Sequence, residues 1–318
     1  MAAHSQPTLE LRVAGRRLDP AGAVVLDLRW PDGAPLPPFT AGAHIDLHLP
    51  NGLVRQYSLW NDPAERHRYC VAVRLEVAGR GGSRAIHQLL PGQRVRVGVP
   101  RNHFGLDETA VHTVLIGAGI GITPLLAMAA RLAASKASFE LHFRAAAREW
   151  APLVETIETS SWRDACRFHF GDRKSFDLGG IVGSSAPGRQ LFVCGPRGFM
   201  DAVKHAAGGW PAANLHTELF ARDEPPTTDG VGFELELART GRSVAVAAGQ
   251  SMLAAIRDAG VVVPTSCEEG ICGTCRTRVL AGVPEHRDMV LTEAERRSNS
   301  FVTPCCSRAL TPRLVLDL

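Results

Sequence analysis

Four cysteines near the carboxyl end of the chain have the spacing of a set of metal ligands. Cys267, Cys272 and Cys275 lie within the nine residues CEEGICGTC, and Cys305 follows in the segment PCCSR. The spacing Cys-x(4)-Cys-x(2)-Cys-x(29)-Cys matches that of plant-type ferredoxins, in which four thiolates hold a [2Fe–2S] cluster. Two glycines in the loop allow backbone N–H groups to turn toward the sulfurs, and such hydrogen bonds help to set the reduction potential.

The same thiols have two other interpretations. Zinc ribbons and fingers usually bring their ligands as two separated short pairs, which one tight triplet with a distant fourth cysteine fits poorly. Buried structural cysteines are the second alternative. Cys306 is adjacent to Cys305, so the fourth ligand has two candidates, and the spacing favours Cys305. We expect Cys70, Cys166 and Cys306 to be small buried hydrophobic residues.

A cluster of this kind predicts a second redox group in the same chain. A [2Fe–2S] centre accepts one electron at a time, whereas most biological reductant arrives as hydride, which carries two. Flavin accepts hydride and returns electrons singly. We therefore expect a flavin site and a nicotinamide site.

The segments RQYSLWN and GRGGS are candidates for the flavin site. The guanidinium of Arg55 could bind a phosphate together with the N–H groups and hydroxyl at Gly82 and Ser83, where a helix is expected to begin. Tyr57 and Ser58 would then meet the isoalloxazine ring. Neither segment is specific by itself, because strand arginines and GGS turns are common on protein surfaces.

The segment GAGIGITP is the candidate for nucleotide binding. Gly117, Gly119 and Gly121 could admit a diphosphate close to the backbone at a helix N-terminus. The segment departs from the Rossmann fingerprint, since Ile122 occupies the place of the third glycine. The segment CGP, which begins at Cys194, also joins an apolar strand to a helix, so it would share the same crevice. A buried thiol in such a place is more often packing than chemistry.

The expected flavin and nucleotide sites lie in two regions of different hydrophobic periodicity. Up to Gly105, six short segments rich in Val and Leu predict a small antiparallel barrel. One helix, SRAIHQLL, is expected there with Ser83 as its cap. From Leu106 to Phe220, apolar runs alternate with helical patterns, which predicts an open parallel sheet of the doubly wound kind. Its ligand is expected at the carboxyl ends of the strands.

The last third of the chain carries the cysteines. Residues 221–230, ARDEPPTTDG, have the composition of a linker. A hairpin made by FELELA and SVAVAA and a helix at SMLAAIRDAG are expected to follow, before the cysteine loop.

Composition narrows the class of protein. The chain has 318 residues, enough for about two or three domains. A net charge of +3 gives no reason to expect nucleic acid or an anionic membrane as partner. The N-terminus lacks the apolar core of a signal peptide, so we expect a cytoplasmic protein with reduced thiols. The uncharged stretch 113–130 has the minimum length of a membrane span, but three glycines and Pro124 interrupt it.

The motifs RQYSL, GGS, GAGIGITP, CGP, TELF and CEEGICGTC…PCCSRA…LVLDL together resemble the phthalate dioxygenase reductase family, and most closely its vanillate O-demethylase reductase branch. The resemblance covers essentially the whole chain, in the same order. It implies an FMN-binding β-barrel domain at residues 1–105 and an NADH-binding α/β domain at 106–220. After the linker at 221–230, it implies a plant-type ferredoxin domain of the β-grasp fold at 231–318. It also favours a monomer.

The resemblance assigns roles to individual residues. Thr123 would face the flavin near the nicotinamide, and Cys194 would lie beside the nicotinamide ring; these two are the predicted catalytic residues. Phe220, in TELF, would shield the flavin. The predicted FMN contacts are Arg55, Tyr57, Ser58, Leu59, Gly82, Ser83, Thr123 and Phe220, the predicted NAD contacts are Gly117, Gly119, Gly121, Cys194, Gly195 and Pro196, and the predicted cluster ligands are Cys267, Cys272, Cys275 and Cys305.

The implied activity is electron transfer from NADH through FMN and the cluster to a separate Rieske-type aromatic oxygenase or O-demethylase. NADPH stays open on the residues alone, because Arg144 and Arg148 follow the second strand of the nucleotide region. FMN rather than FAD rests on the resemblance. A diaphorase acting on small acceptors and a redox sensor are the alternative functions. Glu268, Glu269 and Ile271, in the cluster loop, are the expected docking surface, for a small and short-lived contact.

Overall fold

The computed structural model describes residues 7–172, 176–222, 224 and 226–318. Its internal contacts divide the chain into two compact units, and the boundary falls between Phe220 and Ala221. The first unit contains two sheets and the second a further mixed sheet with a two-stranded ribbon. The predicted subdivision of the first unit after Gly105 coincides with the gap between its two sheets in the sequence, and it stays a prediction.

The first sheet has six antiparallel strands in the order β4-β3-β6-β1-β2-β5. Its two edges approach each other, since the backbone N–H of Trp60 donates to the carbonyl of Cys70 at 3.1 Å. Alternate side chains such as Leu11, Leu26 and Ile45 fill the interior, as the period of two in a strand requires. The strands are β1 (Thr8–Leu18), β2 (Ala23–Arg29), β3 (His44–His48), β4 (Val54–Ser58), β5 (Tyr69–Arg74) and β6 (Arg94–Gly98).

One helix, α1 (Gly82–His87), lies between β5 and β6 in the sequence. The expectation that Ser83 caps it is wrong. Gly81 occupies the cap position with a φ of +93°, and no side chain caps the helix. Ser83 lies inside the first turn, and its Oγ accepts a hydrogen bond from the backbone N–H of Glu76, at 3.0 Å.

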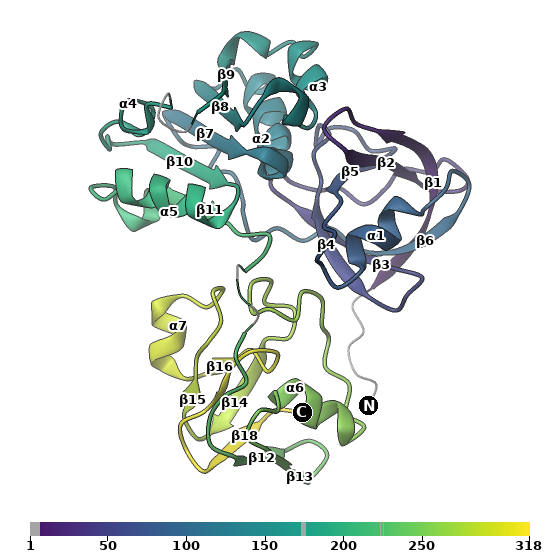
Figure 1. The fold of residues 1–318 in the computed structure, drawn as a ribbon, viewed down its shortest axis with the longest axis vertical. Coiled ribbons are helices and arrows are strands. Elements are labelled where there is room, and N and C mark those ends of the chain that lie inside the picture. Colours follow the sequence, from purple (N-terminus) through teal and green to yellow (C-terminus); the bar gives the residue numbers. More distant parts are fainter. Residues whose placement is uncertain (1–6, 173–175, 223, 225) are drawn as a thin grey trace. The chain divides into compact units, whose positions relative to one another are not determined.

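The second sheet is parallel throughout, with the strand order β11-β10-β7-β8-β9. Neighbouring residues of β7 face the helices on opposite sides of the sheet. Leu115 packs with α2 (Ile122–Ala134), whereas Ile116 packs with α5 (Arg197–Ala206). Figure 1 shows α2 and α3 (Val154–Glu158) on one face and α4 (Leu178–Val182) and α5 on the other. The strands are β7 (His112–Ala118), β8 (Phe139–Ala145), β9 (Cys166–Phe170), β10 (Arg189–Cys194) and β11 (Leu215–Glu218).

The uncharged stretch 113–130 is divided between β7, a short 3-10 turn at Gly119–Gly121 and α2. Among the residues that the structure describes, every helix is too short or too polar to cross a membrane.

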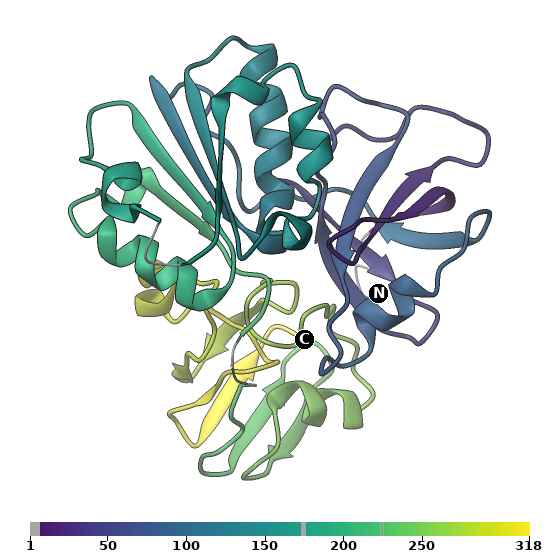
Figure 2. The ribbon, with the colours of Figure 1, turned by 45° about the horizontal axis from the view of Figure 1, so that its top comes forward.

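The second unit has a mixed sheet in the order β13-β12-β18-β14-β16, in which β12 and β18 run parallel. Helix α6 (Met252–Asp258) packs on this sheet and is capped by Ser251, which accepts from the N–H of Ala254. Figure 2 shows the strands and helices from a second direction. The remaining elements are β12 (Phe233–Leu237), β13 (Arg242–Val246), β14 (Thr277–Ala281), β15 (Pro284–Glu285), α7 (Glu293–Ser298), β16 (Phe301–Val302), β17 (Arg308–Ala309) and β18 (Arg313–Leu316).

Candidate functional site

The cysteine loop of the second unit has a backbone that only particular residues tolerate. Gly270 and Gly273 have φ angles of +73° and +69°, and Glu268 has +56°. A Cβ at Gly270 would collide with the Sγ of Cys306. The side chain of Glu268 is held by Arg257, whose Nη2 donates to its Oε1 at 2.6 Å. The glycines are therefore required for the shape of the loop.

The four predicted ligands form two pairs. The Sγ atoms of Cys275 and Cys305 are 3.3 Å apart. Cys267 and Cys272 are the second pair: contact with the Cys272 sulfur raises the pKa of Cys267, and contact with Cys267 lowers the pKa of Cys272 to about 6. Two irons that take two thiolates each need such an arrangement. A single zinc ion would need its four ligands at one point, whereas these cysteines form two pairs.

Backbone donors surround these sulfurs. The N–H of Glu269 donates to Cys267 Sγ at 3.3 Å, and the N–H of Thr274 donates to Cys272 Sγ at 3.5 Å. The pKa of Cys305 is raised by the neighbouring Cys275 sulfur, while the N–H of Gly270 stabilises its thiolate. Hydrogen bonds of this kind stabilise negative charge on thiolate sulfur.

The structure also distinguishes the two adjacent cysteines. Cys305 Sγ lies against Cys275, whereas Cys306 Sγ is 3.2 Å from the hydroxyl of Thr303 and close to Gly270. The side chain of Cys306 therefore packs behind the loop. This arrangement supports Cys305 as the fourth ligand.

In the barrel, residues far apart in the sequence meet at the start of α1. The side chain of Arg55, on β4, lies against Gly82: a Cβ there would be 2.8 Å from Arg55 Cγ. Arg55 Nη1 donates to the carbonyl of Val54 at 2.8 Å. The backbone at Gly82 and Ser83 thus lies beside a guanidinium, as a phosphate site requires.

The rest of the RQYSL segment is mostly enclosed. Burial raises the pKa of Tyr57 to about 12. Ser58 is buried, and Leu59 is fully buried in the barrel core, with its N–H bonded to the carbonyl of Ala43. Leu59 can therefore support the site by packing, and its predicted contact with FMN stays a prediction.

The segment GAGIGITP, called the glycine loop below, lies at the point where the order of strands in the second sheet reverses. After β7 the chain builds β8 and β9 on one side, then returns to build β10 and β11 on the other. Cys194, at the end of β10, pairs in register with Gly117, at the end of β7. Ligands of open α/β sheets bind in the crevice at such a switch point. The two predicted nucleotide motifs therefore meet where the sheet can receive a ligand.

The two loops pack so closely that side chains are excluded. A Cβ at Gly121 would lie 2.5 Å from the carbonyl oxygen of Cys194, and one at Gly195 would lie 3.0 Å from the Cβ of Ala118. Thr123 is buried in the first turn of α2, with its hydroxyl donating to the carbonyl of Ile120 at 3.0 Å. The remaining NAD candidates, Gly119 and Pro196, lie in the same two turns.

Glu218 is a residue of this site that the sequence analysis missed. It ends β11 and pairs with Cys194 of β10. Its Oε2 is shielded from solvent and has no hydrogen-bond partner among the described residues. Burial raises the pKa of Glu218 to about 8, and burial followed by the charge of Glu218 raises the pKa of the Cys194 thiol. Phe220, two residues later, is 40% exposed and so is not a core residue.

Arg144 and Arg148, which kept NADPH possible as the cofactor, bind other groups of the protein. Arg148 donates to Glu158 Oε2 at 2.7 Å, and Arg144 donates to the carbonyl of Gly171 at 2.6 Å.

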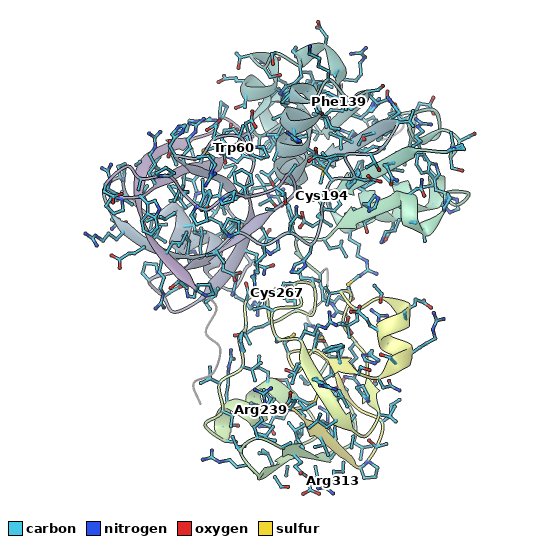
Figure 3. The ribbon with its side chains drawn as sticks, turned by 180° about the vertical axis from the view of Figure 1, so that it is seen from behind. Trp60, Phe139, Cys194, Arg239, Cys267 and Arg313 are labelled. Carbon is cyan, nitrogen blue, oxygen red and sulfur yellow. The ribbon has the colours of Figure 1, made fainter. Side chains whose placement is uncertain are left out.

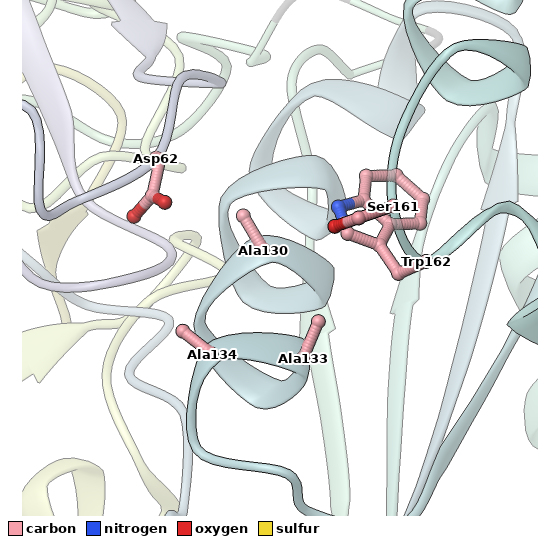
Figure 4. A pocket seen from close by; sticks show the side chains of 6 residues that line it. All are labelled: Asp62, Ala130, Ala133, Ala134, Ser161 and Trp162. Carbon is pink, nitrogen blue, oxygen red and sulfur yellow. The ribbon is translucent and has the colours of Figure 1, made fainter.

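A small cavity of about 170 Å³ lies elsewhere in the first unit, beside the second half of α2. Figure 4 shows Asp62 on one side of the helix and Trp162 on the other. Its alanines, Ala130, Ala133 and Ala134, follow Thr123 by about two to three helical turns. It contains none of the predicted site residues and belongs to a different part of the molecule.

Comparisons with known proteins give a family match within the second unit and relatives that match along both units. Residues 235–310 match the family model described as a 2Fe-2S iron-sulfur cluster binding domain. Vanillate O-demethylase oxidoreductase of Pseudomonas sp. (strain HR199 / DSM 7063) is 44% identical over 316 residues, which cover 98% of this chain and 100% of that protein.

Phthalate dioxygenase reductase of Burkholderia cepacia is 39% identical over 315 residues, with 98% of this chain and 97% of that protein covered. A solved phthalate dioxygenase reductase, described as a modular structure for electron transfer from pyridine nucleotides to [2Fe-2S], aligns with a TM-score of 0.76 at 39% identity, over 98% of both chains. The likeness therefore extends over both units.

Proposed function

The chain belongs to the phthalate dioxygenase reductase family of oxidoreductases, and from this membership we propose where each step of its electron transfer occurs. NADH binds at the switch point of the parallel sheet, between the glycine loop and the CGP turn. FMN binds along β4 of the barrel, with its phosphate at Arg55 and the start of α1. The cluster binds to Cys267, Cys272, Cys275 and Cys305. A separate Rieske-type oxygenase or O-demethylase receives the electrons.

The observation that carries this proposal is the pairing of the four thiols. Two sulfur pairs, with Cys275 and Cys305 at 3.3 Å and Cys267 beside Cys272, suit two irons that each take two thiolates. A redox sensor could share this arrangement, but a sensor has no need of a nucleotide crevice. The switch point with its two packed glycine turns therefore favours an enzyme.

The chain's own residues bind and orient the reactants. Bound FMN supplies the conversion of a hydride into single electrons. Gly121 and Gly195 let the two nucleotide loops pack against each other, and their side-chain-free backbones would admit a diphosphate close to the start of α2. Thr123 and Cys194 lie at the two turns, and both are buried. Burial raises the pKa of Glu218 to about 8, which favours the protonated form of its shielded carboxyl at neutral pH. No general base is needed when positioning and cofactor electronics supply the chemistry.

NADH fits the structure better than NADPH. A 2′-phosphate is normally read by an arginine after the second strand of the nucleotide fold. Here Arg148 is paired with Glu158 and Arg144 with backbone carbonyls at the end of β9. Both positive groups have partners within the protein.

The acceptor is expected to approach the cluster from the side of Cys267. This cysteine is partly exposed, whereas Cys272, Cys275 and Cys305 are buried. The neighbouring residues Glu268, Glu269 and Ile271 are likewise partly exposed. A small contact surface of this kind is typical of short-lived redox encounters.

NADH-dependent reduction of cytochrome c tests the proposal, with Cys272→Ser as the main variant and Cys306→Ser as its matched control. We expect cytochrome c reduction to be lost in Cys272→Ser and kept in Cys306→Ser. NADH oxidation should persist in both variants when a small molecule such as ferricyanide accepts electrons from the flavin. Absence of NADH oxidation by the wild-type chain would contradict the proposed enzyme. Unchanged cytochrome c reduction in Cys272→Ser would instead support the diaphorase, in which flavin bypasses the cluster.

A further inference from the structure

Arg222 joins the start of the second unit to the cysteine loop. It follows Phe220 by two residues, and its side chain is partly buried. Its Nη1 donates to two backbone carbonyls, that of Glu269 at 3.1 Å and that of Arg287 at 2.8 Å. Glu269 lies between the predicted ligands Cys267 and Cys272, so one of these bonds reaches into the loop itself.

The carbonyl that Arg222 binds belongs to a peptide group facing a predicted ligand. In the Glu269–Gly270 peptide, the C=O accepts from Arg222 and the N–H is directed at the sulfur of Cys305. The C=O and N–H of a trans peptide point in opposite directions. A donor held on the oxygen side therefore orients the N–H toward the sulfur. Hydrogen bonds linked through one peptide also polarise each other, by roughly 10–30% per bond.

The surroundings leave this peptide one well-defined position. Gly270 has a φ of +73°, and the space at its α-carbon is closed by Cys306 and by Asp288, whose Cα would be 3.2 Å from an added Cβ. The carbonyl of Gly270 accepts from the N–H of Met289 at 2.8 Å. Arg222 supplies the matching donor for the carbonyl one residue earlier.

Attachment of the segment after Phe220 does not depend on Arg222 alone. Arg287 donates to the carbonyl of Thr227 at 3.0 Å. The fully buried Arg308 donates to the carbonyls of Thr228 and Val231, at 2.9 and 3.0 Å. These hydrogen bonds hold the segment at Thr227, Thr228 and Val231, independently of Arg222. The contact of Arg222 with Glu269 is therefore more than an anchor for the segment.

We propose that Arg222 is a positioning residue for the cluster: it orients the Glu269–Gly270 peptide toward the sulfur of Cys305 and so raises the reduction potential of the bound [2Fe–2S] centre. The inference rests on the cluster site proposed above. The positive charge of Arg222 acts in the same direction, because reduction adds a negative charge to the centre. A higher potential makes the cluster a better acceptor for electrons from the flavin.

The test is a redox titration of the full chain, with dithionite and mediator dyes, followed by visible absorbance and electron paramagnetic resonance. In Arg222→Gln we expect the ratio of reduced to oxidised cluster at the wild-type midpoint to fall by about tenfold, equivalent to a midpoint about 59 mV lower for a one-electron centre. Arg222→Lys keeps the charge but not the planar fork, so its midpoint should lie between the two.

Arg313→Gln is the matched control, because it removes one positive charge at the opposite end of the same unit from Cys267 (Figure 3). Arg313 is 59% exposed and pairs with Glu236, and its loss should leave the midpoint unchanged. A wild-type midpoint in Arg222→Gln would overturn the inference. An equal shift in Arg313→Gln would also overturn it, as would a lower iron content in Arg222→Gln with an unchanged midpoint for the cluster that remains.

If Arg222→Gln binds no cluster, Arg222→Lys decides the question: a lowered midpoint supports the inference, and a wild-type midpoint overturns it. The titration uses chemical reductant and needs no NADH turnover. Failure of NADH turnover would therefore contradict the proposed enzyme and leave this measurement valid. A wild-type chain that binds no iron would contradict the cluster site itself.

Discussion

The cluster site and the nucleotide site are built in opposite ways. Three of the four proposed cluster ligands lie within nine residues of one loop, and the loop's own backbone supplies N–H donors to their sulfurs. The nucleotide site has no comparable local motif. It forms where Gly117 and Cys194, 77 positions apart in the numbering, meet in register at the ends of two parallel strands. A loop site therefore depends on single residue types, whereas a strand-end site depends on close packing between segments.

The largest effect is expected from the ligands of the loop. Cys305→Ser should abolish the visible absorbance and paramagnetic signal of the cluster and lower cytochrome c reduction by at least about 100-fold, the upper end of the effects seen around metal sites. Iron content, absorbance and NADH-dependent turnover measure this. Cys306→Ser is the matched control and should retain the cluster, because its Sγ faces Thr303 and Gly270. Loss of the cluster in both variants would show that the pair cannot be told apart by geometry.

The second prediction concerns the close packing of the two nucleotide loops at the switch point. Gly121→Ala places a Cβ 2.5 Å from the carbonyl oxygen of Cys194, so the two nucleotide loops must separate, at a cost of about 1–3 kcal/mol. We expect a lower Tm and a higher KM for NADH, with the cluster spectrum unchanged. Gly209→Ala, at a glycine with open space around it, is the control. Equal KM values in the two variants would contradict the assignment of NADH to this crevice.

The third prediction concerns pH and compares Glu218 with an exposed acid. Burial raises the pKa of Glu218 to about 8 from its usual value near 4.5. The folded state then binds more protons than the unfolded state between these pH values, so the free energy of unfolding falls as the pH rises from about 4.5 to about 8. At 1.36 kcal/mol per pKa unit the loss is at most about 5 kcal/mol.

Glu218→Gln should remove this part of the pH dependence, while Glu155→Gln, at an exposed position of α3, should keep it. Urea unfolding at a series of pH values measures the slope. A slope unchanged in Glu218→Gln would mean that the carboxylate is ionised in the folded protein at neutral pH.

The smallest effect is expected for Arg148. Its guanidinium pairs with Glu158 on the surface, and such pairs contribute little. Arg148→Ala should change kcat/KM for NADH and for NADPH by less than about twofold each. A selective fall in the NADPH value would show that Arg148 binds a 2′-phosphate and would reverse the proposed cofactor preference. Arg131→Ala, which breaks a comparable surface pair with Glu108 away from the two nucleotide turns, controls for the removal of surface charge.

Much of the architecture could be predicted because its signals are local. Six barrel strands, four strands of the parallel sheet and helices α2, α5 and α6 coincide with apolar patterns in the sequence. The fifth parallel strand, β11, was not predicted. It spans only four residues, Leu215–Glu218, all of them half-buried at the edge of the sheet, so it carries neither a continuous apolar run nor a clear alternation. Glu218 was missed with it, although its position before Phe220 in TELF was the available signal.

The sequence by itself determined the cluster chemistry, the order of the three regions and the family, because ligand spacing, strand and helix periodicity and ordered motifs are properties of neighbouring residues. Only the tertiary structure distinguished Cys305 from Cys306, engaged Arg144 and Arg148 with internal partners, and brought Glu218 beside Cys194. It also placed Arg222 on the carbonyl of Glu269. Each of these depends on strand register or on a side chain reaching a distant backbone group, and neither property is carried by local sequence.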